Sequence, residues 1–208
     1  MKRLIAFLLA ICMLCVMAAC APSETPEQIL ERQKQEYAEF RQTLAWKDVE
    51  AVNARVEVLD DGTRMLMTDV VNHSETDDVA SFVLSFACWD KDGNFVIIKT
   101  QGNPENTYSI YESTDTEIEI KAGETWVADA GFKLAEACPE IAYVEAIVVS
   151  YKTATATVEH ETEYNEWQNR YIDQPLDGWV MELMDAEQAD GAADADPTDD
   201  TATADTAQ

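Results

Sequence analysis

Basic side chains are scarce in this sequence of 208 residues, which holds 14 Lys and Arg against 41 Asp and Glu. The formal net charge at pH 7 is −27, so the chain lacks the cations that would neutralise phosphate groups. This balance argues against DNA, RNA and anionic lipid headgroups as partners. The sequence also lacks a fixed repeat period and has only seven glycines, which argues against solenoids and collagen.

Histidines are few and closely spaced glycines are absent, so most sequence signatures of enzymes are missing. His73 and His160 are the only histidines, and neither lies in a metal-ligand or catalytic-triad pattern. No two glycines have the G-x-G spacing of nucleotide-binding loops, and no G-x-S-x-G nucleophile elbow is present. We therefore expect no catalytic residues that the sequence can identify, and no metal ligands.

One segment resembles the start of a calcium loop. Asp90, Asp92 and Asn94 have the required spacing, but Phe95 and Gln101 stand where the loop needs Gly and Glu. A hairpin turn explains these residues better. We expect no cofactor, while a weak calcium site formed by other carboxylates stays open.

The chain begins with the pattern of an export signal. Lys2 and Arg3 precede an uninterrupted apolar run over residues 4–19, which is shorter than the roughly 20 residues of a membrane-spanning helix. The run ends in small residues before Cys20, as in a bacterial lipobox. We predict a lipoprotein signal peptide over 1–19 and a lipidated tether over 20–24; an ordinary signal peptide or an uncleaved anchor is the alternative.

Lipidation at Cys20 predicts where the protein resides. Acyl chains on this residue would enter the bilayer, with about 0.8 kcal/mol for each buried CH₂ group. We therefore expect an extracytoplasmic lipoprotein, anchored to the outer face of the cytoplasmic membrane of a bacterium. The lipid bilayer and an envelope protein are its expected partners.

Export also changes the interpretation of the cysteines. Cys88 and Cys138 remain in the mature chain, and an exported pair is a candidate disulfide. Two buried thiols are the alternative. A catalytic thiol is not expected, because no histidine or basic cluster lies nearby in the sequence to lower its pKa.

An amphipathic helix is predicted over residues 25–46. Thr25 is a good N-cap, Pro26 suits the first helical position, and Gln28 completes a capping box. Four apolar residues then lie on one face: Leu30, Tyr37, Phe40 and Leu44. The stripe could dock on the domain that follows or join a partner helix in a coiled coil.

From residue 49 the apolar period changes to two, which predicts β-strands. Strands are expected over 49–58, 64–72, 79–89, 95–99, 108–112, 117–121, 126–134, 142–152 and 153–160. The segment 79–89 is apolar on both faces, which indicates a central strand. Seven to nine short strands at regular spacing predict a mainly β fold, an antiparallel immunoglobulin-like β-sandwich.

The period returns to that of a helix near the end of the domain, which we place over 47–184. Tyr164, Trp167 and Tyr171 would share one face of a short C-terminal helix. They are candidates for stacking on glycan rings, although a face that packs the helix on a sheet is the plainer interpretation. Residues 185–208 are mostly Ala, Asp and Thr, so we predict a disordered acidic tail.

Several segments resemble a family of exported domains from Gram-positive gut bacteria. The resemblance lies in residues 69–72, 86–94, 146–151 and 164–167, with Tyr171 and Leu176, and extends over about residues 47–176. It implies a domain of unknown function that is similar to immunoglobulin-like sandwiches. The family has no assigned activity, so the resemblance identifies no functional residue.

Three functions are compatible with these features. The leading hypothesis is a membrane-anchored, non-enzymatic domain that binds another protein. The second is a glycan- or cell-wall-binding module that uses the aromatic set at 164, 167 and 171. The third is a hydrolase that uses a pair of acids, and among 41 acidic residues the sequence does not identify that pair.

The lipobox generates the first prediction. Replacing Cys20 by Ser should abolish incorporation of an alkyne-labelled fatty acid and move the protein from the membrane fraction to the medium. The variant Cys15→Ser, which changes a cysteine inside the signal peptide, should keep both the label and the membrane location. A Cys20→Ser protein that is still labelled would contradict the lipoprotein assignment.

Overall fold

The computed structural model describes residues 24–45 and 48–193, and the chain divides into two units at residues 43 and 44. The predicted signal peptide, Cys20 and residues 194–208 lie outside this description. Within it, no helix combines the length and the apolar character needed to cross a bilayer.

The first unit contributes helix α2 (Pro26–Ala45). The predicted capping box is confirmed: the amide of Gln28 donates to Oγ1 of Thr25 at 3.3 Å, and the amide of Thr25 donates to Oε1 of Gln28 at 3.0 Å. These two bonds satisfy amides that no helical carbonyl can reach. The start of the helix is therefore determined by its local sequence.

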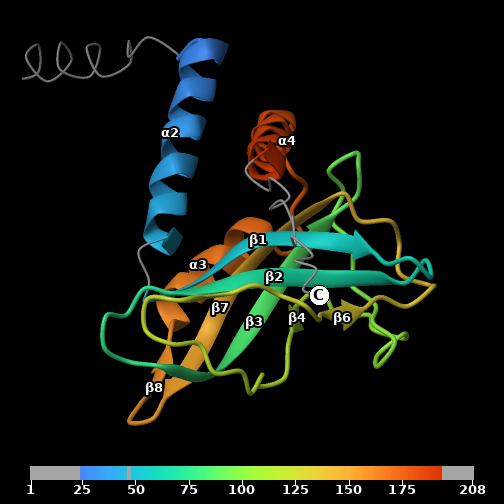
Figure 1. Ribbon diagram of the computed structural model, residues 1–208. Helices are drawn as coiled ribbons and strands as arrows, with labels where there is room; N and C mark the ends of the chain where they lie inside the picture. Colours follow the sequence, from blue (N-terminus) through green and yellow to red (C-terminus); the bar gives the residue numbers. More distant parts are fainter. Residues whose placement is uncertain (1–23, 46–47, 194–208) are drawn as a thin grey trace, which may run out of the picture. The chain divides into compact units, whose positions relative to one another are not determined.

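The second unit is mainly β, as predicted, with two antiparallel sheets and two helices that follow them (Figure 1). The first sheet has the order β1-β2-β5, with β6 also paired to β2. Its strands are β1 (Val49–Val58), β2 (Arg64–Asn72), β5 (Thr125–Trp126) and β6 (Phe132–Lys133). The second sheet has the order β4-β3-β7-β8, with β4 (Tyr111–Glu112), β3 (Val79–Trp89), β7 (Tyr143–Thr153) and β8 (Thr157–Glu159).

The core lies between the two sheets. Strand β3 is buried on both faces and pairs with β7 along nearly its whole length, which confirms the central strand predicted from its sequence. Phe82, Leu84 and Phe86 of β3 pack against Leu66 and Val70 of β2. Burial of each such side chain contributes about 1.5–3 kcal/mol.

Five predicted strands are absent or shorter than expected. Of the segment 108–112 only β4 (Tyr111–Glu112) is a strand, and of 153–160 only residue 153 at the end of β7 and β8 (Thr157–Glu159) are. Residues 95–99 and 117–121 make only isolated bridges, such as the one between Val79 and Ile120. The predicted strand over 126–134 is broken into β5 and β6, because residues 127–131 leave the ladder of β2. Alternation of apolar residues shows that a segment has a buried side, but not that a neighbouring backbone is within hydrogen-bonding reach.

The two sheets curl so that β1 lies against β7, while their strands cross at a steep angle (Figure 1). On the opposite side, segment 116–118 beside β3 and segment 126–132 beside β2 form the two borders of an opening. The arrangement is a curled pair of antiparallel sheets rather than two plainly facing layers.

Two helices, rather than the single short helix predicted, follow the last strand: α3 (Glu161–Tyr171) and α4 (Gly178–Ala193). The chain between them is fastened to the β3 end, where the indole of Trp89 donates to the carbonyl of Gln174 at 2.7 Å. Helix α4 continues past residue 184 into the first part of the segment for which a disordered tail was predicted. Ala, Glu and Gln favour helix, and the end of α4 is rich in them.

Gly131 generates a prediction about stability. A Cβ at this position would lie 2.4 Å from the carbonyl oxygen of Leu66 and 2.5 Å from Cγ of Met67, so Gly131→Ala must push β6 away from β2. We expect a loss of about 1–3 kcal/mol in the free energy of unfolding, measured by urea denaturation. Gly102→Ala is the control, because its Cβ would meet nothing within 4 Å; equal effects of the two variants would contradict the crowding.

Candidate functional site

The opening between the sheets is an apolar pocket of about 210 Å³, which we call the inter-sheet pocket. Its floor is formed by side chains of β2 and β3, namely Leu66, Thr68, Phe82, Leu84 and Phe86. Thr116 and Ile118 form one border, and Trp126 with residues 129–132 forms the other. Asp129 is the single ionisable side chain in this lining.

The pocket exists because one edge of β2 is only partly paired. Strand β5 pairs with Val70 and Val71, and β6 pairs with Met65 and Leu66. Between these contacts no described strand pairs with this edge, and Oδ1 of Asp69 accepts the amide hydrogen of Ala128 at 2.9 Å instead. A side chain therefore satisfies a backbone group that a continuous ladder would satisfy, and segment 127–131 is free to bow outward.

Asp69 is buried and ionised at the centre of this arrangement. Burial is the largest influence on the pKa of Asp69 and raises it, but hydrogen bonds from the Ala128 amide, from Asn53 and from Arg55 together lower the pKa below its ordinary value. The Asn53 and Arg55 bonds measure 2.9 and 3.0 Å. Asn53 itself has a positive φ of 54° at a register shift in β1, which places both donors over Asp69.

Aromatic rings form much of the pocket wall. The ring centroids of Phe82 and Trp126 are 5.7 Å apart, and those of Phe86 and Phe132 are 5.8 Å apart. Tyr111 extends the group, at 5.7 Å from Phe132. Such tilted and edge-on contacts hold the rings in defined positions, so the pocket is already shaped without a ligand.

The aromatic set predicted for glycan stacking lies elsewhere, on α3. Trp167 is 0% exposed and Tyr171 is 2% exposed, so neither ring offers a face to a sugar in solution. Tyr171 packs edge-on against Trp89 at 5.5 Å, and Trp167 lies 6.1 Å from Tyr164. Their burial removes the observation on which the stacking role was based: this face packs the helix.

Tyr164 is the only half-buried member of that set, and its hydroxyl is also engaged. It donates to Glu112 of β4 and lies 3.3 Å from Oγ of Ser85. Burial and the bond to Glu112 raise the pKa of Tyr164 to about 12, so the phenol stays neutral and joins α3 to the second sheet.

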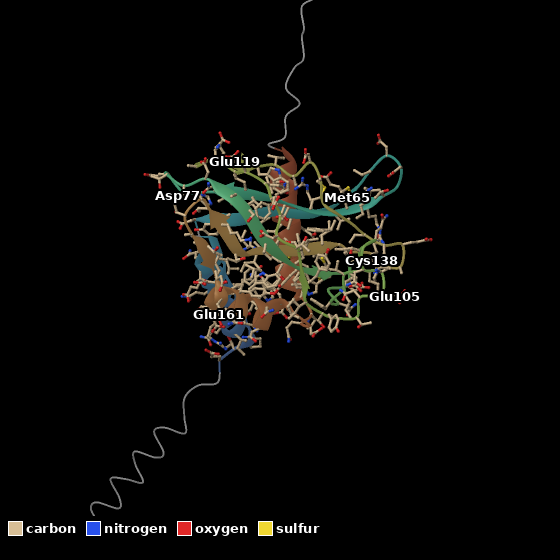
Figure 2. The ribbon with its side chains drawn as sticks, turned by 90° about the horizontal axis from the view of Figure 1, so that it is seen from below. Met65, Asp77, Glu105, Glu119, Cys138 and Glu161 are labelled. Atoms are coloured by element: carbon tan, nitrogen blue, oxygen red, sulfur yellow. The ribbon has the colours of Figure 1, made fainter. Side chains whose placement is uncertain are left out.

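Cys88 and Cys138 are both buried in the core cluster and are free thiols in the structure. In the view of Figure 2, Cys138 is labelled on the side away from Asp77 and Glu119. Burial raises the pKa of Cys88 well above its ordinary value, and the neighbouring Cys138 adds to this shift. The structure thus contains no bond between the two sulfurs, and the disulfide stays a prediction.

The segment that resembles a calcium loop is a turn. Oδ1 of Asp90 accepts the amides of Asp92 and Asn94, each at 2.9 Å, and Gly93 has a φ of 77°. Across residues 24–45 and 48–193, no three His, Cys, Asp or Glu side chains gather as a metal site requires.

Sequence reasoning did not identify the inter-sheet pocket. The consecutive residues Asp129, Ala130 and Gly131 interrupt the apolar alternation of the predicted strand over 126–134. This interruption was the available signal, because an Asp followed by small residues is unusual within a paired strand. It shows where the ladder breaks, but not that the break opens onto the core.

The fold and the pocket define the class of protein: a mainly β domain of two antiparallel sheets with an apolar opening between them. The chain belongs to DUF5780, a family of unknown function, whose profile matches residues 65–174, more than half of the chain. The predicted resemblance to a family of unknown function is confirmed at that level. Both borders of the pocket lie within the matched residues.

No curated protein matches the chain. A solved structure of a hypothetical protein from Peptoclostridium difficile 630 is similar, with 9% sequence identity and a TM-score of 0.48, and the match covers 66% of this chain and 97% of that one.

The lowered pKa of Asp69 generates a prediction about pH. The pKa of Asp69 is lower in the folded chain than in the unfolded chain, so the ionised carboxylate stabilises the fold. This stabilisation is complete above the pKa of the unfolded chain, about 3.9, and is lost as the pH falls through the pKa of the folded chain. At neutral pH, Asp69→Asn should reduce the free energy of unfolding by about 1.5–3 kcal/mol, and the difference from wild type should shrink below pH 4.

Urea denaturation between pH 3 and 7 measures this difference. Asp60→Asn is the control, because Asp60 is exposed in the β1–β2 turn and should give no difference at any pH. If the loss in free energy of unfolding caused by Asp69→Asn stays constant down to pH 3, the ionised form of Asp69 is not the source of the stabilisation.

Proposed function

We propose that this protein is a membrane-anchored extracytoplasmic lipoprotein whose domain binds another protein of the cell envelope through the inter-sheet pocket. The proposal includes acylated Cys20 as its anchor, at the outer face of the bacterial cytoplasmic membrane. It also treats the two curled sheets as a variant of the immunoglobulin-like sandwich. The support for this finer fold class is that the two antiparallel sheets share one core.

The observation that carries the proposal is the character of the inter-sheet pocket. Apolar side chains, four of them aromatic, line an opening that reaches from the surface into the core, and Asp129 is the single ionisable group in it. Apolar concave surfaces of this kind contribute binding free energy when a partner removes them from water.

The same lining favours binding over hydrolysis. Acid-based glycoside hydrolysis needs two carboxyl groups on either side of the reacting bond, and the pocket lining contains one. The pKa values of Asp69 and of Tyr164 are shifted by contacts that join strands and helices to one another, at groups outside the pocket lining. Shifts of that kind support folding rather than proton transfer.

A photo-crosslinking experiment on intact cells tests the proposal. p-Benzoyl-phenylalanine is placed at Val127, which is 65% exposed beside the pocket, in the full lipidated chain. We expect one protein to be attached in a reproducible ratio to the bait and to be identified by mass spectrometry.

Val58 provides the matched control, because it is 68% exposed and lies at the end of β1, away from the pocket lining. The probe at Val58 should give little of the same adduct. Attachment of wall glycan alone, or the same adducts from both positions, would contradict a protein-binding role for the pocket.

A further inference from the structure

We infer that the inter-sheet pocket receives one bulky apolar side chain of a peptide segment that carries Lys or Arg nearby. This inference rests on the proposed function and makes it more specific, because it states the chemistry of the partner. Three features of the described residues lead to it: the size of the pocket, the charges at its borders, and the exposure of one border.

The size of the pocket fits one side chain better than a larger ligand. Pockets for small-molecule ligands usually measure about 300–1,000 Å³, whereas this one measures about 210 Å³. A dry apolar cavity of about 150 Å³ already binds benzene. A Phe, Trp, Leu or Met side chain therefore fills the inter-sheet pocket, in the way that anchor residues fill pockets at protein interfaces.

The charges at the borders favour a basic segment around that anchor. Asp129 belongs to the lining of one border. Glu117 is exposed and is the sequence neighbour of Thr116 and Ile118, which line the other border. Among the described residues, neither carboxylate has an ion-pair partner. The neighbouring acids differ, since Asp115 pairs with Lys152 and Glu119 pairs with Lys121.

The formal charge of −27 extends this preference beyond the pocket. A partner segment with an acidic character would be repelled before contact, whereas a basic segment would be attracted. Each exposed ion pair adds little affinity, so the apolar anchor supplies most of the binding and the charges supply the selectivity.

One border of the pocket is exposed enough for a chain to approach. Ala130 is exposed at the mouth, as is Val127 nearby, and segment 127–131 has no strand on its outer side among the described residues. An extended peptide that passes this border can insert one side chain and place a cation about three residues away, roughly 10 Å along the chain.

Selection from a library of random linear peptides displayed on phage tests the inference. The target is the full lipidated chain in nanodiscs of uncharged lipid. We expect enriched peptides to share a Phe, Trp, Leu or Met with Lys or Arg within about three residues of it. Replacing the anchor of an enriched peptide by Ala should weaken binding about tenfold or more, and replacing its cations by Glu should weaken it further.

Two variants of the protein locate the binding. Ala130→Trp places a large ring at the exposed mouth and should reduce the affinity of the enriched peptide about tenfold or more. The double change Asp129→Asn and Glu117→Gln should reduce it about two- to fivefold and weaken its salt dependence. Circular dichroism and urea denaturation of each variant show that the fold is retained; Lys91→Gln, at an exposed site in the 90–94 turn, serves as the charge control.

Several results would overturn the inference. These are enrichment of acidic or uncharged peptides, binding that Ala130→Trp does not change, and no enrichment while free indole or a fatty acid occupies the pocket. A dimer of this chain that Ala130→Trp dissociates would assign the pocket to a second copy. If the crosslinked cell partner is found and the peptide result is negative, the proposed function survives and only its peptide chemistry fails.

Discussion

The contact between the Asp69 carboxylate and the Ala128 amide is the constraint on which the rest of the site depends. This carboxylate is buried, yet it receives hydrogen bonds from Ala128, Asn53 and Arg55, so its charge is compensated from two sides. It stands where a strand would otherwise complete the ladder of β2. Because the Ala128 amide is satisfied in this way, segment 127–131 can leave the sheet without an orphaned donor at that point, and the core opens beneath it.

The opening is placed by the curl of the two sheets. Strand β1 lies against β7 on one side, so apolar side chains there are covered by the neighbouring sheet. On the opposite side, the described residues make only short pairings, by β4, β5, β6 and isolated bridges. Trp126 and Phe132 are partly exposed there. Among the described residues, the inter-sheet pocket thus offers an apolar entrance on a chain that is strongly acidic as a whole.

The elements predicted correctly are those whose cause is local. Thr25 and Gln28 bond to each other across one turn, so the start of α2 follows from four adjacent residues. Strands β1, β2, β3 and β7 are each nine to eleven residues long, so their apolar patterns identify them as strands. Segments 117–121 and 126–134 show similar alternation, but whether they pair depends on neighbours distant in sequence, and there the prediction was wrong or incomplete.

By itself the sequence determined the mainly β class, the capped N-terminal helix, the central strand β3 and the acidic character of the whole chain, because periodicity, capping and charge are properties of neighbouring residues. Only the tertiary structure decided the roles of Asp69, Trp126 and Trp167. The Asp69 carboxylate accepts the Ala128 amide hydrogen in place of a strand carbonyl, Trp126 borders the pocket, and Trp167 is a buried packing residue. An aromatic ring on a helix has the same sequence pattern whether it is exposed or buried. Its burial depends on strands that are distant in sequence and pack around it, so only the tertiary structure distinguishes the two cases.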